Sequence, residues 1–176
     1  VSVSQINLLL DTLIASFLMT GSISWLYYSD RLLEFPLGLF GIAIATVILP
    51  ALSRNHVGKD DQGFKNNLDW AFKIICLLGI PAATALVLLA FPLLMVIFQR
   101  GEFSVVDAQM ASYSLIAYGS GLLGFMLVKI LAPAFYARQD TRTPVKYGII
   151  TMAINMLFNL IFAIPFGYVG LAIATA

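Results

Sequence analysis

Residues 24–54 read SWLYYSDRLLEFPLGLFGIAIATVILPALSR, and this stretch decides the fold class of the chain. Its charged residues stand near its two ends, at Asp30, Arg31, Glu34 and Arg54. No charge interrupts the residues between Glu34 and Arg54, and about 20 apolar residues let an α-helix cross roughly 30 Å of hydrocarbon. The stretch therefore predicts a membrane-spanning helix at about residues 31–52, and prolines and glycines inside it predict a kink.

The rest of the chain repeats this pattern. Hydrophobic residues make up 60% of the 176 residues and charged residues 11%, and the mean hydropathy is +0.93. An average soluble domain has roughly 45–50% apolar and about 25% charged residues, so a soluble globular domain is excluded. We predict an all-α, polytopic transmembrane helix bundle that forms a single membrane-embedded lobe over residues 1–176. It has five full spans and the start of a sixth, at about 4–27, 31–52, 71–98, 110–136, 147–164 and 168–176.

The two ends of the sequence suggest a longer protein. The chain starts at Val1 without an initiator methionine or a signal-peptide layout, and Ala176 lies inside an apolar run. We therefore expect an excerpt. Its single cysteine, Cys76, cannot form a disulfide framework or a cysteine-based metal site.

Lysine and arginine predict the orientation of the spans, because they are enriched in cytoplasmic loops. Two loops with their flanks, at residues 54–70 and 138–146, hold seven of them: Arg54, Lys59, Lys65, Lys73, Arg138, Arg142 and Lys146. The opposite side has Arg31 and Arg100. We therefore expect both basic loops to be cytoplasmic.

Charge inside a span is costly and is a hypothesis of function by default. Glu34 stands about 40° from Asp30 and about 60° from Arg31 around the helix, so the three share one face at the outer end of the predicted second span. One interpretation is an interfacial, salt-bridged helix cap. The other is that Arg31 faces an internal cavity and binds an anionic head group, because its planar fork of donors suits phosphate oxygens. Asp30 and Glu34 would then hold Arg31 in place or compete for it.

A second set of polar residues lies in the first, fifth and sixth spans, at Asp11, Asn155, Asn159 and Thr175. Their carboxylate, amide and hydroxyl oxygens are ligands for a hard cation such as sodium if they converge. The alternative is interhelical hydrogen bonding without an ion. Lys129 in the fourth span either reaches the cytoplasmic interface or faces a cavity.

Enzymes receive little support from the sequence. The only histidine, His56, stands in a charged loop without the spacing of a zinc site. The sequence has no nucleophile elbow, P-loop or dinucleotide-binding motif. We expect a protein that is not an enzyme and that has no cofactor, apart from the candidate sodium ion.

The stretch at residues 24–54, LLMVIFQRGEFS at 93–104 and LAPAFYARQDTRTPVKYG at 131–148 together carry a family resemblance. The chain resembles the MurJ (MviN) lipid II flippases of the MOP transporter superfamily over essentially its whole length. The resemblance implies a transporter of fourteen transmembrane helices, of which this chain would be helices seven to eleven and the start of twelve. It would form most of the carboxy-terminal lobe.

The resemblance also implies a function. The whole protein would move the lipid-linked peptidoglycan precursor lipid II from the inner to the outer leaflet of the bacterial cytoplasmic membrane, by alternating access between two lobes. Its partners would be lipid II, the phospholipid bilayer and the amino-terminal lobe, with no nucleic acid. The fragment alone would not transport.

Family likeness further implies roles for single residues. Arg31 would be a cavity cation that binds substrate, with Asp30, Glu34 and Lys129 as further substrate-site candidates. Asp11, Asn155, Asn159 and Thr175 stand where the ligands of a sodium site would lie. An acid can occur in the family at the position of Asn159, so this chain departs there from the family pattern.

Two other classes of function stay open at this stage. A related MOP exporter would carry a polysaccharide-linked lipid or small cationic drugs, and loss of drug export would follow substitution of Asp11 and Glu34 rather than of Arg31. A non-transporting membrane scaffold would use the charged face as a protein contact and would tolerate Arg31→Lys.

Overall fold

In the computed structural model, residues 9, 11–18, 21–99 and 103–176 are described. Their secondary structure is helical throughout and contains no strand, so the all-α prediction is confirmed. After a helical stretch at 11–16, the elements are α2 (Ser22–Pro36), the π-helix η1 (Leu37–Ile42), α3 (Ala43–Val57), α4 (Asp61–Leu88), α5 (Ala90–Phe98), α6 (Val105–Ala137), α7 (Arg142–Phe166) and α8 (Tyr168–Thr175). The predicted start of the first span at residues 4–8 and the predicted loop cation Arg100 lie outside the described residues.

Four helices among the described residues are long and apolar enough to cross a membrane: Ser22–Val57, Asp61–Leu88, Val105–Ala137 and Arg142–Phe166. Most large apolar side chains of these helices face outward, where lipid or further protein would cover them. The chain is therefore a multi-pass membrane protein.

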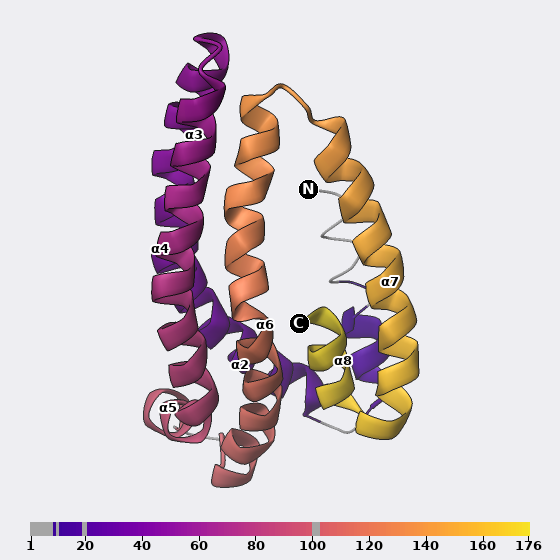
Figure 1. The fold of residues 1–176 in the computed structure, drawn as a ribbon. Coiled ribbons are helices and arrows are strands. Elements are labelled where there is room, and N and C mark those ends of the chain that lie inside the picture. Colours follow the sequence, from indigo (N-terminus) through magenta and orange to yellow (C-terminus); the bar gives the residue numbers. More distant parts are fainter. Residues whose placement is uncertain (1–8, 10, 19–20, 100–102) are drawn as a thin grey trace.

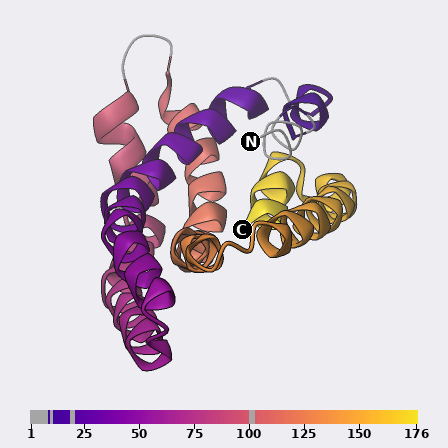
Figure 2. The same cartoon turned by 90° about the horizontal axis from the view of Figure 1, so that it is seen from above.

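The helix α6 forms the centre of the bundle (Figure 1). It contacts α2, η1, α3, α4, α5, α7 and α8. Its own buried residues include Leu115, Leu122, Met126 and Ile130. The helices α3 and α4 form one hairpin beside α6, and α7 and α8 form another on its other side (Figures 1 and 2). The two hairpins meet mainly through α6.

The predicted break between the first two spans, at Tyr28 to Asp30, is wrong. The helix α2 begins at Ser22 and continues through these residues, after Gly21 in a left-handed conformation with φ of 100°. Ser29 does not interrupt the helix, because its buried hydroxyl lies 2.8 Å from the carbonyl oxygen of Trp25 and 2.7 Å from that of Ala111. The chain therefore turns at Gly21, where only glycine adopts the required conformation without strain.

The π-helix η1 shifts the buried stripe of the long helix by one residue. Buried positions in α2 are Ser22, Trp25, Ser29, Leu32, Leu33 and Pro36. A regular α-helix would continue this stripe at residues 40, 43 and 47. The buried residues are instead Gly41, Ile44, Ile48 and Leu52, so η1 holds one extra residue and keeps both halves turned toward the bundle.

The loops of the structure are shorter than predicted. The expected loop at 54–70 is wrong, because α3 runs to Val57 and α4 starts at Asp61. Asp60 makes this possible, since its carboxylate accepts a hydrogen bond from the backbone N–H of Gly63 and caps α4. The loop at 138–146 likewise shortens to residues 138–141, where Asp140 accepts hydrogen bonds from the backbone N–H groups of Arg142 and Thr143.

The predicted third span at 71–98 is divided in two. The helix α4 ends at Leu88, Leu89 departs from helical geometry, and α5 starts at Ala90. Pro92 lies in the first turn of α5, where a missing backbone N–H leaves no intrahelical bond unmade. The fourth span starts earlier than predicted, at Val105, because Ser104 and Asp107 form a capping box.

Candidate functional site

Arg31 lies on an exposed face of α2 and forms an ion pair with Glu34. Its Nη1 donates to Oε2 of Glu34 at 2.8 Å, and the two side chains are 54% and 53% exposed. Its Nε donates to the hydroxyl oxygen of Tyr27 at 3.2 Å. Such an exposed pair contributes little to folding stability, about 0–1 kcal/mol, so the side chains are available for contacts beyond this lobe.

Asp30 stands on the same helix but does not join this pair. Among the described residues it forms no ion pair with Arg31, and Glu34 takes the guanidinium instead. Asp30 is exposed on α2.

All four residues of the second polar set meet in one network. Asn159 donates through Nδ2 to Oδ1 of Asp11 at 2.5 Å and to Oδ1 of Asn155 at 3.1 Å. Asn155 donates through its own Nδ2 to the carbonyl oxygen of Ala174 at 2.9 Å and to Oγ1 of Thr175 at 3.3 Å. The network joins the helical stretch at 11–16 to α7 and α8. The sequence alone did not establish that these four residues meet.

One oxygen in this network has no partner among the described residues. Oδ1 of Asn159 is buried without a hydrogen bond, and the residue is 1% exposed. An unmet buried acceptor costs about 1–3 kcal/mol, so a cation at this oxygen would be stabilising. The set offers one carboxylate with amide, hydroxyl and main-chain oxygens, which are hard ligands. The residues therefore fit a small hard cation.

The described residues contain no cluster of three or more histidine, cysteine, aspartate or glutamate side chains able to hold a metal. The polar network around Asp11 instead combines a single carboxylate with neutral oxygens. Such a set of oxygen ligands with one negative charge suits a hard cation of low charge.

Lys129 projects from α6 toward the π-helix. Its Cγ lies 3.5 Å from the place where a Cβ would stand on Gly41, so its aliphatic stem packs against η1. The residue is exposed and forms no ion pair within the described residues.

Sequence reasoning missed Tyr27 as a partner of Arg31. The signal was present, because residues four apart on a helix are neighbours on its surface. Tyr27 stands four residues before Arg31, and the guanidinium carbon lies 5.1 Å from the centre of its ring.

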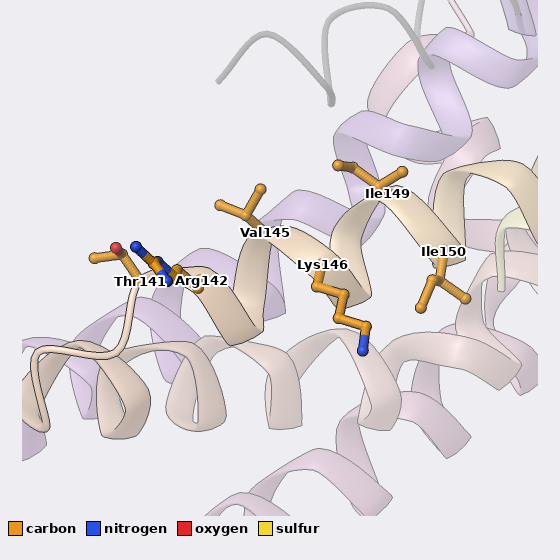
Figure 3. A pocket seen from close by; sticks show the side chains of 6 residues that line it. All are labelled: Thr141, Arg142, Val145, Lys146, Ile149 and Ile150. Atoms are coloured by element: carbon orange, nitrogen blue, oxygen red, sulfur yellow. The ribbon is translucent and has the colours of Figure 1, made fainter.

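A shallow groove on α7 includes no residue of either polar set in its lining (Figure 3). It has a volume of about 490 Å³ and is lined by Thr141, Arg142, Val145, Lys146, Ile149 and Ile150. Val145 and Ile149 point to one side of the helix and Lys146 and Ile150 to the other. Because one helix supplies nearly all of the lining, the groove is an open surface and not an enclosed binding cavity.

Comparison with known families identifies the chain. The family model described as lipid II flippase MurJ matches residues 1–176. The chain is similar to a probable lipid II flippase MurJ of Vibrio cholerae, at 66% identity over all of this chain and 34% of the relative. It is 43% identical to the lipid II flippase MurJ of Burkholderia cenocepacia, over 99% of this chain and 34% of that protein. The chain thus spans about a third of the length of these relatives.

Solved structures show the same fold. A lipid II flippase MurJ in an inward closed conformation superposes with a TM-score of 0.88 at 32% identity, over 98% of this chain and 36% of that one. An outward-facing multidrug resistance MATE family transporter of the MOP superfamily superposes with a TM-score of 0.85, over 99% of this chain and 38% of that one. Its 17% identity carries information on the fold alone. On the match of its full length to the family model and on its identity to these relatives, the chain belongs to the family of the lipid II flippase MurJ.

Proposed function

We propose that the protein of which this chain forms a part is a lipid II flippase. It moves the lipid-linked peptidoglycan precursor from the inner to the outer leaflet by alternating access between two lobes. The support is membership of the MurJ family and 66% identity to a relative named as a probable lipid II flippase. The protein is a transporter and not an enzyme, it lies in the bacterial cytoplasmic membrane, and the turns at residues 58–60 and 138–141 face the cytoplasm.

The chain supplies the carboxy-terminal lobe, and an amino-terminal lobe supplies the other side of the substrate cavity. The coverage of 34% of the relative supports this division. Lipid II and the surrounding phospholipids are the partners of the whole protein. A lobe that carries one wall of a cavity does not transport alone, because alternating access needs two bodies that move against each other.

Arg31 is the residue that contacts the diphosphate of lipid II in this proposal. The carrying observation is an arginine in a membrane-spanning helix whose side chain is held by Glu34 and still 54% exposed. A guanidinium binds phosphate oxygens through two parallel N–H bonds. Glu34 exchanges with the diphosphate for Arg31 as the protein changes state, and the exposed Asp30 and Lys129 adjust the charge of the same cavity.

Sodium is the ion that the second polar set binds in this proposal, through Asp11, Asn155, Asn159 and Thr175. The support is the buried Oδ1 of Asn159, which has no hydrogen-bond partner among the described residues and lies within a set of hard oxygen ligands. Bound sodium would supply positive charge beside Asp11 and would hold α7 and α8 against the helical stretch at 11–16. In the full-length protein, NaCl should raise the thermal unfolding midpoint above that in choline chloride of equal ionic strength, and Asp11→Ala should remove the difference. Equal midpoints for the native protein in both salts would contradict the sodium proposal.

The test of the main proposal is complementation of a strain depleted of its own lipid II flippase by the full-length protein. Arg31→Ala and Arg31→Lys should both reach the membrane at native levels and fail to support growth, because lysine lacks the planar fork. Arg54→Ala, which removes an exposed arginine of α3, is the matched control and should complement.

Each of the other outcomes would support a different function. Complementation by both Arg31 variants would show that the charged face is only an interfacial cap. Complementation by Arg31→Lys alone would favour a scaffold or a simple charge requirement. An exporter of cationic drugs would instead lose its activity with Asp11 and Glu34 substitutions while Arg31→Ala remained active.

A further inference from the structure

Arg31 is held from two sides along one face of α2. Tyr27, Arg31 and Glu34 are four and three residues apart, which places them within about 60° around the helix. Nε of Arg31 donates to Tyr27 at 3.2 Å, and Nη1 donates to Glu34 at 2.8 Å. The guanidinium is therefore fixed by a phenol one turn before it and by a carboxylate one turn after it.

Three donors of Arg31 have no partner among the described residues. A guanidinium carries five N–H donors, of which Tyr27 and Glu34 each take one. Both N–H groups of Nη2 and the second of Nη1 remain. A phosphate group binds a guanidinium through two parallel N–H bonds, so Nη2 is available for that contact while Tyr27 holds Nε.

The two partners differ in what they do to an anionic ligand. Glu34 carries a negative charge 2.8 Å from Nη1 and repels a diphosphate that approaches the same nitrogen. The hydroxyl of Tyr27 accepts a hydrogen bond without adding charge. The face of its ring is also attractive to the cation, whose central carbon lies 5.1 Å from the ring centre. Tyr27 can hold Arg31 in both the free and the ligand-bound state, and Glu34 can do so only in the free state.

Tyr27 is itself held in place by other aromatic rings. Its ring meets that of Tyr28 edge to face, at 5.7 Å between centres. The Tyr28 ring in turn lies 4.8 Å from the rings of Phe98, at the end of α5, and Phe103, just before α6. Aromatic pairs at these distances are attractive. The orientation of the Tyr27 hydroxyl is thus tied to the packing of α2 against its neighbours.

We propose that Tyr27 is the positioning residue of the substrate cation: its hydroxyl and ring hold the Arg31 guanidinium through Nε and leave the Nη donors to bind the diphosphate of the lipid substrate. This inference rests on the proposed function, in which Arg31 contacts that diphosphate. Tyr27 itself does not contact the phosphate groups. It lowers the entropy that Arg31 would lose on binding, because a preoriented side chain has less freedom to give up.

The test uses the purified full-length protein and lipid II as the probe, with affinity measured by titration. Tyr27→Phe keeps the ring and removes the hydroxyl, and should weaken lipid II binding about three- to tenfold, the effect of one hydrogen bond. The thermal unfolding midpoint should not change. Tyr147→Phe is the matched control, because Tyr147 on α7 is 62% exposed, and its affinity should equal that of the native protein.

A second substitution separates positioning from a structural role. Lysine has no guanidinium Nε–H that the Tyr27 hydroxyl could hold. In a protein that already carries Arg31→Lys, adding Tyr27→Phe should therefore not lower the affinity for lipid II further. An equal loss of affinity with and without Arg31→Lys would overturn the inference, as would an unchanged affinity of Tyr27→Phe alone. If Arg31→Ala weakens binding and Tyr27→Phe does not, only this inference fails. If Arg31→Ala leaves binding unchanged, the proposed function of Arg31 fails first.

Discussion

Trp25 of α2 donates its indole N–H to Oδ1 of Asp107 at 2.8 Å, across 82 residues of chain. Asp107 also closes the capping box that starts α6, and the Trp25 ring lies 4.9 Å from the ring of Tyr168 in α8. One buried side chain therefore joins three helices at the same end of the bundle.

Trp25→Phe should destabilise the full-length protein by about 1–2 kcal/mol, because it keeps an aromatic ring and loses a hydrogen bond to a charged group. Trp25 is 7% exposed, so its side chain packs inside the bundle, and phenylalanine has no donor for Asp107. Unfolding of the purified protein in detergent gives the measurement. The control is Trp70→Phe on α4, where the side chain is 49% exposed, and it should change stability little. Equal effects of the two substitutions would mean that the bond to Asp107 contributes nothing.

Two glycines of α6 should respond in opposite ways to a larger side chain. A Cβ on Gly119 would lie 3.1 Å from Cγ2 of Val87 in α4, whereas a Cβ on Gly124 would meet nothing within 4 Å. Gly119→Leu should therefore destabilise by about 1–3 kcal/mol through overpacking. Gly124→Leu should cause no loss, since leucine also has the higher helix propensity. Thermal midpoints of the two variants test this, and similar values would show that α4 and α6 do not approach closely at Gly119.

The start of α7 should weaken in acid. The hydroxyl and backbone N–H of Thr143, with the backbone N–H of Arg142, hold the pKa of Asp140 below its ordinary value. A carboxylate with a lowered folded-state pKa stabilises the protein above its unfolded pKa, near about 4, and this stabilisation is lost as the pH falls through the folded value. The thermal midpoint should therefore drop below about pH 4.

Asp140→Asn should lower the midpoint at neutral pH and reduce this acid-dependent drop. Asp61→Asn, which removes an exposed carboxylate from the first turn of α4, should retain the drop. If the thermal midpoint of Asp140→Asn drops in acid as much as that of the native protein, other carboxylates cause the drop.

Asn159→Asp should make stability depend strongly on sodium. Asn159 donates to Asp11 at 2.5 Å, so an aspartate there places two carboxylates in contact. Their repulsion should lower the midpoint in choline chloride, and NaCl of equal ionic strength should recover it by neutralising both. Asn66→Asp, on the exposed face of α4, is the matched control and should respond equally to both salts. Equal midpoints of Asn159→Asp in the two salts would argue against a cation at this position.

The helical class could be predicted from the sequence, but the boundary between the first two spans could not. Tyr28, Ser29 and Asp30 follow an apolar run and predict a break, because polar residues often end helices. Whether Ser29 ends a helix depends on its partner, and here that partner is the carbonyl of Ala111, 82 residues away. The true turn at Gly21 has only the short run TGS at residues 20–22 as its local signal, and several other glycines of the chain lie inside helices.

The contacts of the candidate site could likewise be predicted from the sequence only in part. Contacts within one helix, such as that between Arg31 and Glu34, follow from their spacing. The contact between Asp11 and Asn159 spans 148 residues, and no local pattern fixes it. The residue types of that network could be read from the sequence, and only the packing of α7 and α8 brought them together.

The extra residue in η1 has a consequence for chain length. Because the π-helical turn takes up one residue more than an α-helical turn, a relative shorter by one residue between Leu37 and Ile42 could run as a plain α-helix and keep both buried stripes. A deletion of one residue elsewhere in α2 or α3 would instead turn everything beyond it by about 100°. This segment is therefore the place in the long helix where a deletion of one residue leaves the direction of Arg31 and the packing of Ile48 unchanged.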